Sequence, residues 1–155
     1  MHELRAELES ERSPMVISGC VGPRGDGYDA GKVMSPQEAE AYHAPQIRIY
    51  AEEDADQITA VTMTNVNEAI GVTRAATAAG MPVVISFTVE TDGRLPTGDT
   101  LKDAIAAVDA ATGNAPAYYM INCAHPDHFD AALDGDWVSR IGGIRATAPR
   151  CSLAH

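Results

Sequence analysis

The stretch Asn122–His128 (NCAHPDH) carries the most reactive combination of side chains in the sequence. Its cysteine closes an apolar run, and two histidines follow within five residues. A soft thiolate and imidazole rings suit zinc, although C-x-H-x-x-H is not a standard zinc spacing. The residues alone leave two interpretations: Cys123 is a ligand or nucleophile, or it is a small buried cysteine followed by loop histidines.

Other reactive side chains have a structural interpretation beside the functional one. Cys20 lies in the middle of an apolar run, which predicts a core position. Cys151 lies near the end of the sequence and receives little functional weight. The segment Gly22–Asp26 (GPRGD) is either a substrate-binding loop or a tight turn, and its composition alone favours the turn. Glu90 is either a general base or the entry to a loop, and His43 has a surface or packing role by default.

Short apolar runs rich in β-branched residues predict five strands, at about 15–21, 57–64, 83–89, 117–123 and 141–146. Amphipathic segments between them predict helices at about 35–52, 67–79, 101–111 and 127–133. Ser35 and Glu38 form a capping-box pattern around Pro36, and Pro45 predicts a kink in the helix that they start.

Alternating strands and helices, with strands apolar on both faces, indicate an α/β fold with a parallel sheet. Polar residues follow each predicted strand, which is typical of a (βα)8 barrel: Asp26, Thr62, Thr64, Ser86, Thr88, Glu90, Asn122, Cys123 and Arg145. Such a barrel needs ~250 residues, so this chain is expected to hold about five of eight units. We therefore expect a polar helical segment at 1–14 and an incomplete barrel domain at 15–155.

The charge balance makes nucleic acid an unexpected partner. The sequence holds 11 Lys and Arg against 22 Asp and Glu, a formal net charge of -11, which repels phosphate backbones. No run approaches the ~18 apolar residues of a membrane span. Three widely spaced cysteines without a signal peptide predict a cytoplasmic protein with reduced thiols.

Six segments together resemble the homocysteine S-methyltransferase family, over about residues 16–152. Each is weak alone, and their order and spacing make the match specific. They are 18–28 (SGCVGPRGDGY), 42–46 (YHAPQ), 67–71 (NEAIG), 85–88 (ISFT), 121–126 (INCAHP) and 141–146 (IGGIRA).

The resemblance implies a (βα)8 barrel, here about its strands three to seven, that transfers a methyl group to homocysteine and so gives methionine. In the family, three cysteine thiolates hold zinc and the homocysteine sulfur takes the fourth position. Zinc keeps that sulfur as a thiolate, which attacks the methyl donor. Cys123 matches the first zinc cysteine, and Asp26, Thr62 and Asn122 are the implied substrate-binding residues.

The sequence departs from the family at three places. The other two zinc cysteines, an adjacent pair in a Gly-Gly-Cys-Cys motif, are absent, and the neighbours of Cys151 match a different family segment. The opening strands that help to bind the amino-acid carboxylate are also missing. Many members carry a Glu that binds the substrate amino group where this chain has Val61.

Three hypotheses follow. The first is a truncated or degraded methyltransferase with an incomplete zinc site, inactive by itself, whose small-molecule partners are a thiol and a methyl donor. The second is a non-catalytic α/β binding or oligomeric module, in which self-association covers exposed strand edges. The third is a different zinc hydrolase that uses Cys123, His125 and His128.

Overall fold

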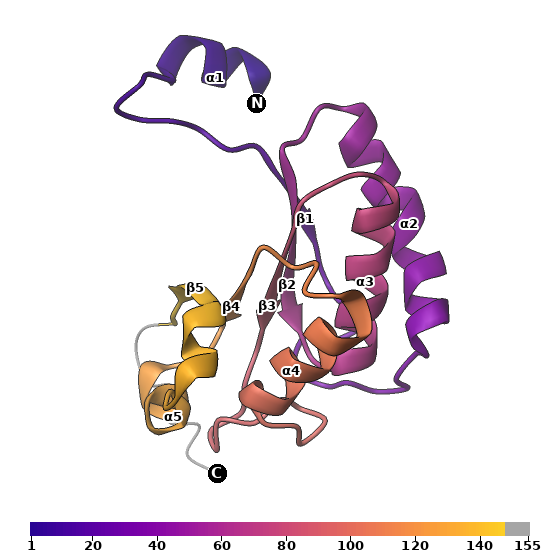
Figure 1. Ribbon diagram of the computed structural model, residues 1–155, viewed down its shortest axis with the longest axis vertical. Coiled ribbons are helices and arrows are strands. Elements are labelled where there is room, and N and C mark those ends of the chain that lie inside the picture. Colours follow the sequence, from indigo (N-terminus) through magenta and orange to yellow (C-terminus); the bar gives the residue numbers. More distant parts are fainter. Residues whose placement is uncertain (148–155) are drawn as a thin grey trace.

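The computed structural model describes residues 1–147 and places five parallel strands in one open sheet (Figure 1). The strands lie in chain order and each pairs with the next. Their bounds are β1 Ser18–Val21, β2 Gln57–Met63, β3 Val83–Phe87, β4 Tyr118–Asn122 and β5 Ile141–Arg145. The predicted α/β class and parallel sheet are confirmed, and each strand is shorter than its apolar run.

The helices connect the strands in the predicted order. They are α1 His2–Leu8, α2 Pro36–Glu52, α3 Val66–Ala78, α4 Leu101–Thr112 and α5 Pro126–Phe129, with short 3-10 segments η1 Asp130–Ala132 and η2 Asp136–Arg140. The capping box of Ser35 and Glu38 is confirmed at the start of α2. Pro45 lies inside α2, and the helix continues past this residue without interruption. The expected kink at Pro45 stays a prediction.

Helices α2, α3 and α4 pack on one side of the sheet and form the core there (Figure 1). In β1, Gly19 and Val21 face these helices and are buried. Gly71 brings α3 close to α2, because a Cβ at this position would lie 2.4 Å from the Cβ of Ala39. The close approach of the two helices therefore requires a residue without a side chain at position 71.

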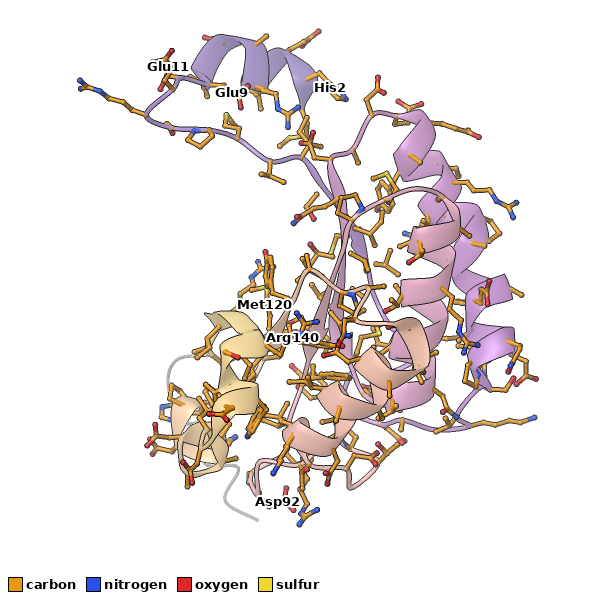
Figure 2. The ribbon with its side chains drawn as sticks, viewed as in Figure 1. His2, Glu9, Glu11, Asp92, Met120 and Arg140 are labelled. Atoms are coloured by element: carbon orange, nitrogen blue, oxygen red, sulfur yellow. The ribbon has the colours of Figure 1, made fainter. Side chains whose placement is uncertain are left out.

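The opposite face of the sheet has no helix of residues 1–147 against it. Cys20 faces this side and is exposed, so its predicted core position is wrong. Because side chains alternate between the two faces of a strand, Cys20 projects to the face that Val21 does not occupy. The apolar run in the sequence does not reveal which of the two faces is covered by helices. Met120 of β4 also lies toward this uncovered side, where a Cβ added at Gly143 of β5 would lie 3.0 Å from Met120 Cε (Figure 2).

The N-terminal segment that carries α1 is tied to the end of the sheet where the strands begin. Arg5 forms an ion pair with Asp56 and donates a hydrogen bond to the carbonyl of Met15. The carboxylate of Asp56 also accepts from the amide of Ile17. The division at residue 14 into a separate segment and a barrel domain stays a prediction.

Within residues 1–147, no helix combines the length and apolar character that crossing a membrane requires.

Candidate functional site

The carboxyl ends of β2 and β4 bring Thr62 and Cys123 together at one rim of the sheet. Thr62 lies within an irregularity in the β2–β3 register, with φ of 57°, and Cys123 follows β4 directly with φ of 56°. Left-handed backbone is uncommon for residues other than glycine and disfavours a β-branched side chain such as that of Thr62 most. Such conformations cluster at functional sites, where the surrounding contacts maintain them.

Asn122 holds this rim together through its side-chain amide. Its Oδ1 accepts from the amide of Thr62 at 2.9 Å and from the hydroxyl of Ser86 at 2.5 Å. Its Nδ2 donates to the Thr62 hydroxyl at 2.8 Å and to the Cys123 sulfur at 3.1 Å. Asn122 is 4 % exposed, so these bonds fix the position of the sulfur from inside the protein.

Tyr28 approaches the same sulfur from the loop that follows β1. The pKa of Tyr28 is raised, first by the negative charge of Cys123, then by a hydrogen bond with that residue, by burial and by Asp26. Asp26 also accepts a hydrogen bond from the amide of Tyr28 at 2.8 Å, which makes it a turn-forming residue. The loop therefore presents a phenol to the thiol.

The buried carboxylate of Glu68, in the first turn of α3, anchors the loop after β1. Its Oε1 accepts from the amide of Arg24 at 2.7 Å and lies 2.9 Å from His43 Nε2. Its Oε2 accepts from Asn65 at 3.3 Å. Burial raises the pKa of Glu68, but the hydrogen bonds from His43, Arg24 and Asn65 outweigh burial, so its pKa is below the usual value.

The Cys123 thiol opens into a pocket of about 350 Å³ at the rim of β2, β4 and β5. The pocket is lined by Val61, Thr62, Asn122, Cys123, Arg145, Ala146 and Thr147. The implied site residues Thr62 and Asn122 are thus brought to Cys123, whereas Asp26 lies in the loop and does not line the pocket. Binding of substrate by Asp26, Thr62 and Asn122 stays a prediction.

The two histidines after Cys123 do not join it. The ring of His125 accepts a hydrogen bond from the amide of Asp127 at 3.2 Å and caps the short helix α5. Among residues 1–147, no three His, Cys, Asp or Glu side chains lie together in a way that could hold a metal ion. The described part of the chain therefore gives the zinc hydrolase hypothesis no support.

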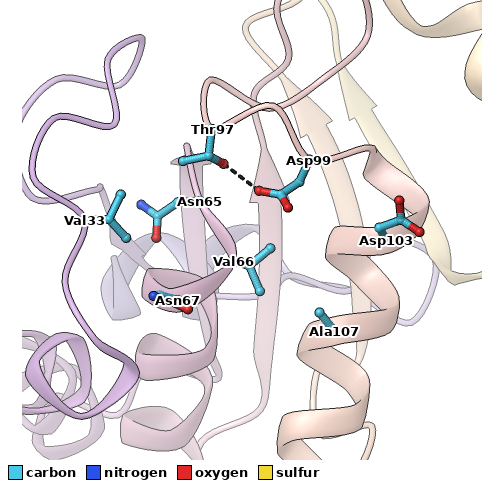
Figure 3. A pocket seen from close by; sticks show the side chains of 8 residues that line it. All are labelled: Val33, Asn65, Val66, Asn67, Thr97, Asp99, Asp103 and Ala107. Atoms are coloured by element: carbon cyan, nitrogen blue, oxygen red, sulfur yellow. Dashed lines mark hydrogen bonds between the residues drawn. The ribbon is translucent and has the colours of Figure 1, made fainter.

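A second pocket, of about 390 Å³, lies between the N-terminal ends of α3 and α4 (Figure 3). Four of its polar side chains, those of Asn65, Thr97, Asp99 and Asp103, are bonded to each other or to helix ends. Asn65 caps α3, Thr97 donates to Asp99 at 2.7 Å, and Asp103 accepts from Thr100 at the start of α4. We assign a structural role to this pocket.

The sequence model of the homocysteine S-methyltransferase family matches residues 1–147 of the chain. The chain belongs to the homocysteine S-methyltransferase family. The expected resemblance is therefore confirmed over the same elements that build the Cys123 rim. None of the curated proteins compared with the chain matches it.

Solved structures of the homocysteine methyltransferase MmuM from Escherichia coli have the same fold. The apo form aligns with a TM-score of 0.68 at 23% identity, covering 96% of this chain and 64% of that one. The metallated and oxidized forms each align with a TM-score of 0.71 at 22% identity, covering 96% of this chain and 62% of those chains. This family member thus spans less than two thirds of the enzymes it resembles, and its five-stranded sheet is a partial TIM-type barrel.

Sequence reasoning missed the buried polar groups that support the site. His43, expected to have an ordinary packing or surface role, is 2% exposed and pairs with Glu68, which is 3% exposed. Ser86 was noted only as polar, and its bond to Asn122 joins β3 to β4. The Asn-x-x-Glu spacing from Asn65 to Glu68 indicates a helix start, but this pattern does not reveal burial.

Proposed function

We propose that this chain provides the thiol-bearing rim of a thiol methyltransferase and transfers no methyl group by itself. In this proposal Cys123 is a metal-ligand thiol, and the reaction of the complete enzyme gives methionine from homocysteine and a methyl donor. The observation that carries the proposal is the position of the Cys123 sulfur. It lies at the carboxyl rim of a parallel sheet, held by Asn122 and open to a pocket.

Residues 1–147 do not fit a complete zinc site. Catalytic zinc takes three protein ligands, and the described residues offer no group of three donors. The side chains that interact with the sulfur include those of Asn122, Thr62 and Tyr28, which are weak ligands for zinc. We therefore derive no step through the metal, and the chain's own contribution is to hold and orient one thiol.

Hydrogen bonds from neighbouring side chains hold the Cys123 sulfur in place. Asn122 donates to the sulfur from a buried position, and Ser86 and Thr62 keep the Asn122 amide in one orientation. Tyr28, in the loop after β1, also interacts with Cys123, which raises the pKa of the phenol. A ligand held in this way loses little side-chain freedom when a metal or a substrate sulfur arrives.

Metal titration of the full chain tests this proposal. Cobalt(II), which reports thiolate ligation by its absorption spectrum, should bind weakly and through Cys123. Binding should be lost in Cys123→Ser and kept in Cys20→Ser, a matched control because Cys20 is an exposed cysteine of the same sheet. Methyl transfer from S-methylmethionine to homocysteine should be undetectable for the chain with added zinc.

Two results would contradict the proposal. Cobalt binding that survives Cys123→Ser would show that this thiol is not a ligand. Zinc-dependent turnover by the isolated chain would show that it completes a working site alone. An absence of any thiolate–cobalt absorption would favour the non-catalytic module.

We also propose that the chain associates with itself through its sheet edges. Within residues 1–147, β1 and β5 each pair with one neighbouring strand only. Unpaired edges are templates for further strand pairing. Light scattering across a concentration series should show a mass above that of the 16.4 kDa monomer, and a constant monomer mass would contradict this part of the proposal.

A further inference from the structure

The pocket beside Cys123 has an unbalanced charge. Of the side chains of residues 1–147 that line it, Cys123 and Arg145 are ionisable and the rest are neutral: Val61, Thr62, Asn122, Ala146 and Thr147. No carboxylate of residues 1–147 belongs to this lining. Apart from the thiol, the charged side chain that residues 1–147 offer to a ligand here is therefore that of Arg145.

The Arg145 guanidinium is available to a ligand. Arg145 is the register partner of Asn122, and residues paired in this way project to the same face of a sheet. Its side chain is exposed and forms no hydrogen bond or ion pair with another residue of the range 1–147. Its backbone carbonyl accepts from the amide of Cys123 at 3.2 Å, which keeps the two residues adjacent.

The other lining side chains of residues 1–147 are uncharged and offer no carboxylate to a positively charged ligand group. Val61 is apolar. The Oδ1 of Asn122 already accepts two hydrogen bonds, and the Thr62 hydroxyl already accepts one from Asn122. An ammonium group placed here would lose water without gaining a carboxylate partner from residues 1–147 and would face Arg145, which costs free energy. A carboxylate would instead pair with the guanidinium.

We infer that this pocket takes a thiol that carries a carboxylate and no amino group, a mercaptocarboxylate, in preference to an amino-acid thiol such as homocysteine. This inference rests on one part of the proposed function, the role of Cys123 as a metal-ligand thiol that meets a substrate thiol, and it names a preferred acceptor other than homocysteine. Val61 and Arg145 are the residues that set the preference. Val61 contributes an apolar wall without charge, and Arg145 supplies a cation.

Thiol–disulfide exchange at Cys123 measures this preference without metal or methyl donor. The probes are homocystine and 4,4′-dithiodibutyrate, which differ by the amino groups alone. The Cys123 thiolate attacks one probe sulfur, the probe disulfide breaks, and the departing thiolate carries the electron pair away and takes a proton from water. Rates at Cys123 and at Cys20 are read separately by peptide mass mapping of the full chain.

Cys20 serves as the internal control for the intrinsic reactivity of each probe. It is an exposed thiol on the same sheet and is absent from the residues that line the pocket. We expect the dithiodibutyrate-to-homocystine rate ratio to be about two- to fivefold higher at Cys123 than at Cys20, the size of one partly exposed ion pair.

Substitutions of Arg145 and Val61 test whether these residues set the preference for the anionic probe. Arg145→Gln should reduce the ratio at Cys123 to that at Cys20, whereas Arg48→Gln should leave it unchanged. Arg48 is an exposed arginine of α2, on the other side of the sheet, so it matches the loss of charge. Val61→Glu should invert the preference toward homocystine, and Val61→Gln, of similar size but neutral, should not invert it.

Equal ratios at Cys123 and Cys20 in the unmodified chain would overturn the inference, as would a preference that survives Arg145→Gln. Either result would leave the metal-ligand role of Cys123 intact, because that role is read from cobalt binding. Conversely, a failure of the unmodified chain to bind cobalt would refute the metal-ligand role of Cys123 without changing the measured charge preference.

Discussion

The two sides of the thiol rim are built in opposite ways. On one side, the loop after β1 is fixed by Glu68, a buried carboxylate that accepts from Arg24 and Asn65 and pairs with His43. On the other side, Cys123 and Arg145 face an open pocket, and Arg145 has no partner within residues 1–147. The molecule thus places a buried polar cluster on one side of the site and leaves the ionisable groups of the pocket accessible to a ligand on the other.

Because of this difference, substitutions in the buried cluster should change stability, and substitutions at the exposed pocket should change reactivity or binding. Removing one member of a buried ionic cluster leaves the others desolvated and unpaired, which is costly. Removing an exposed group that has no partner in the protein costs little stability, and its effect appears when a ligand binds. Substitutions on the two sides should therefore change different measurements.

Glu68→Ala should have the largest effect on stability. It leaves His43, the Arg24 amide and Asn65 without their acceptor, and we expect the free energy of unfolding to fall by ~3–5 kcal/mol. Urea unfolding measures this change. Glu52→Ala, an exposed glutamate at the end of α2, is the matched control and should change little. An equal loss in both variants would remove the distinction between the two sides.

Asn122→Ala should have the next largest effect, because Asn122 is buried but also touches the thiol. The amide of Thr62 and the hydroxyl of Ser86 lose their acceptor, which should cost ~1–3 kcal/mol. The same variant should change the alkylation rate of Cys123 by iodoacetamide, since the sulfur loses its bond from Asn122. An unchanged alkylation rate at Cys123 would show that Asn122 does not orient the thiol.

The buried carboxylate of Glu68 should also make stability depend on pH in the acid range. The pKa of Glu68 in the folded chain is below its usual value of 4.5, so folding favours the carboxylate. The resulting stabilisation is present above the unfolded pKa and is lost as the pH falls through the folded pKa. Urea midpoints between pH 6 and pH 3 should therefore fall less steeply in Glu68→Gln than in the unmodified chain, and parallel slopes would contradict this assignment.

Arg145→Gln should have the smallest effect on stability and a measurable effect on chemistry. Its side chain is exposed and has no partner in residues 1–147, so the urea midpoint should stay the same. The preference of Cys123 for the anionic probe should nevertheless disappear. A clear loss of stability would show that Arg145 has a structural role and would weaken the comparison.

Much of the fold is predictable from the sequence because its signals are local. Apolar β-branched runs gave the five strands, and the pattern of Ser35 with Glu38 gave the start of α2. The position of Cys123 at a strand end was also predictable, since the run before it stops at Asn122.

The burial of individual polar residues is less predictable. His43 and Glu68 are 25 positions apart in the sequence and meet because α2 and α3 pack closely at Gly71. Cys20 looks like a core residue in its apolar run and is exposed because one face of the sheet is uncovered. Neither outcome can be predicted from a local sequence pattern, since each depends on which helices and strands become neighbours in the fold.

The sequence alone determined the alternation of strands and helices, the helix caps and the thiol at the end of β4, because these depend on spacing and on the intrinsic preferences of residues. The tertiary structure decided which groups share the rim. Thr62 and Asn122 lie 60 positions apart and are joined by two hydrogen bonds. Parallel pairing of β2, β3 and β4 brings their carboxyl ends together, and this long-range register places Thr62, Asn122 and Cys123 around one pocket.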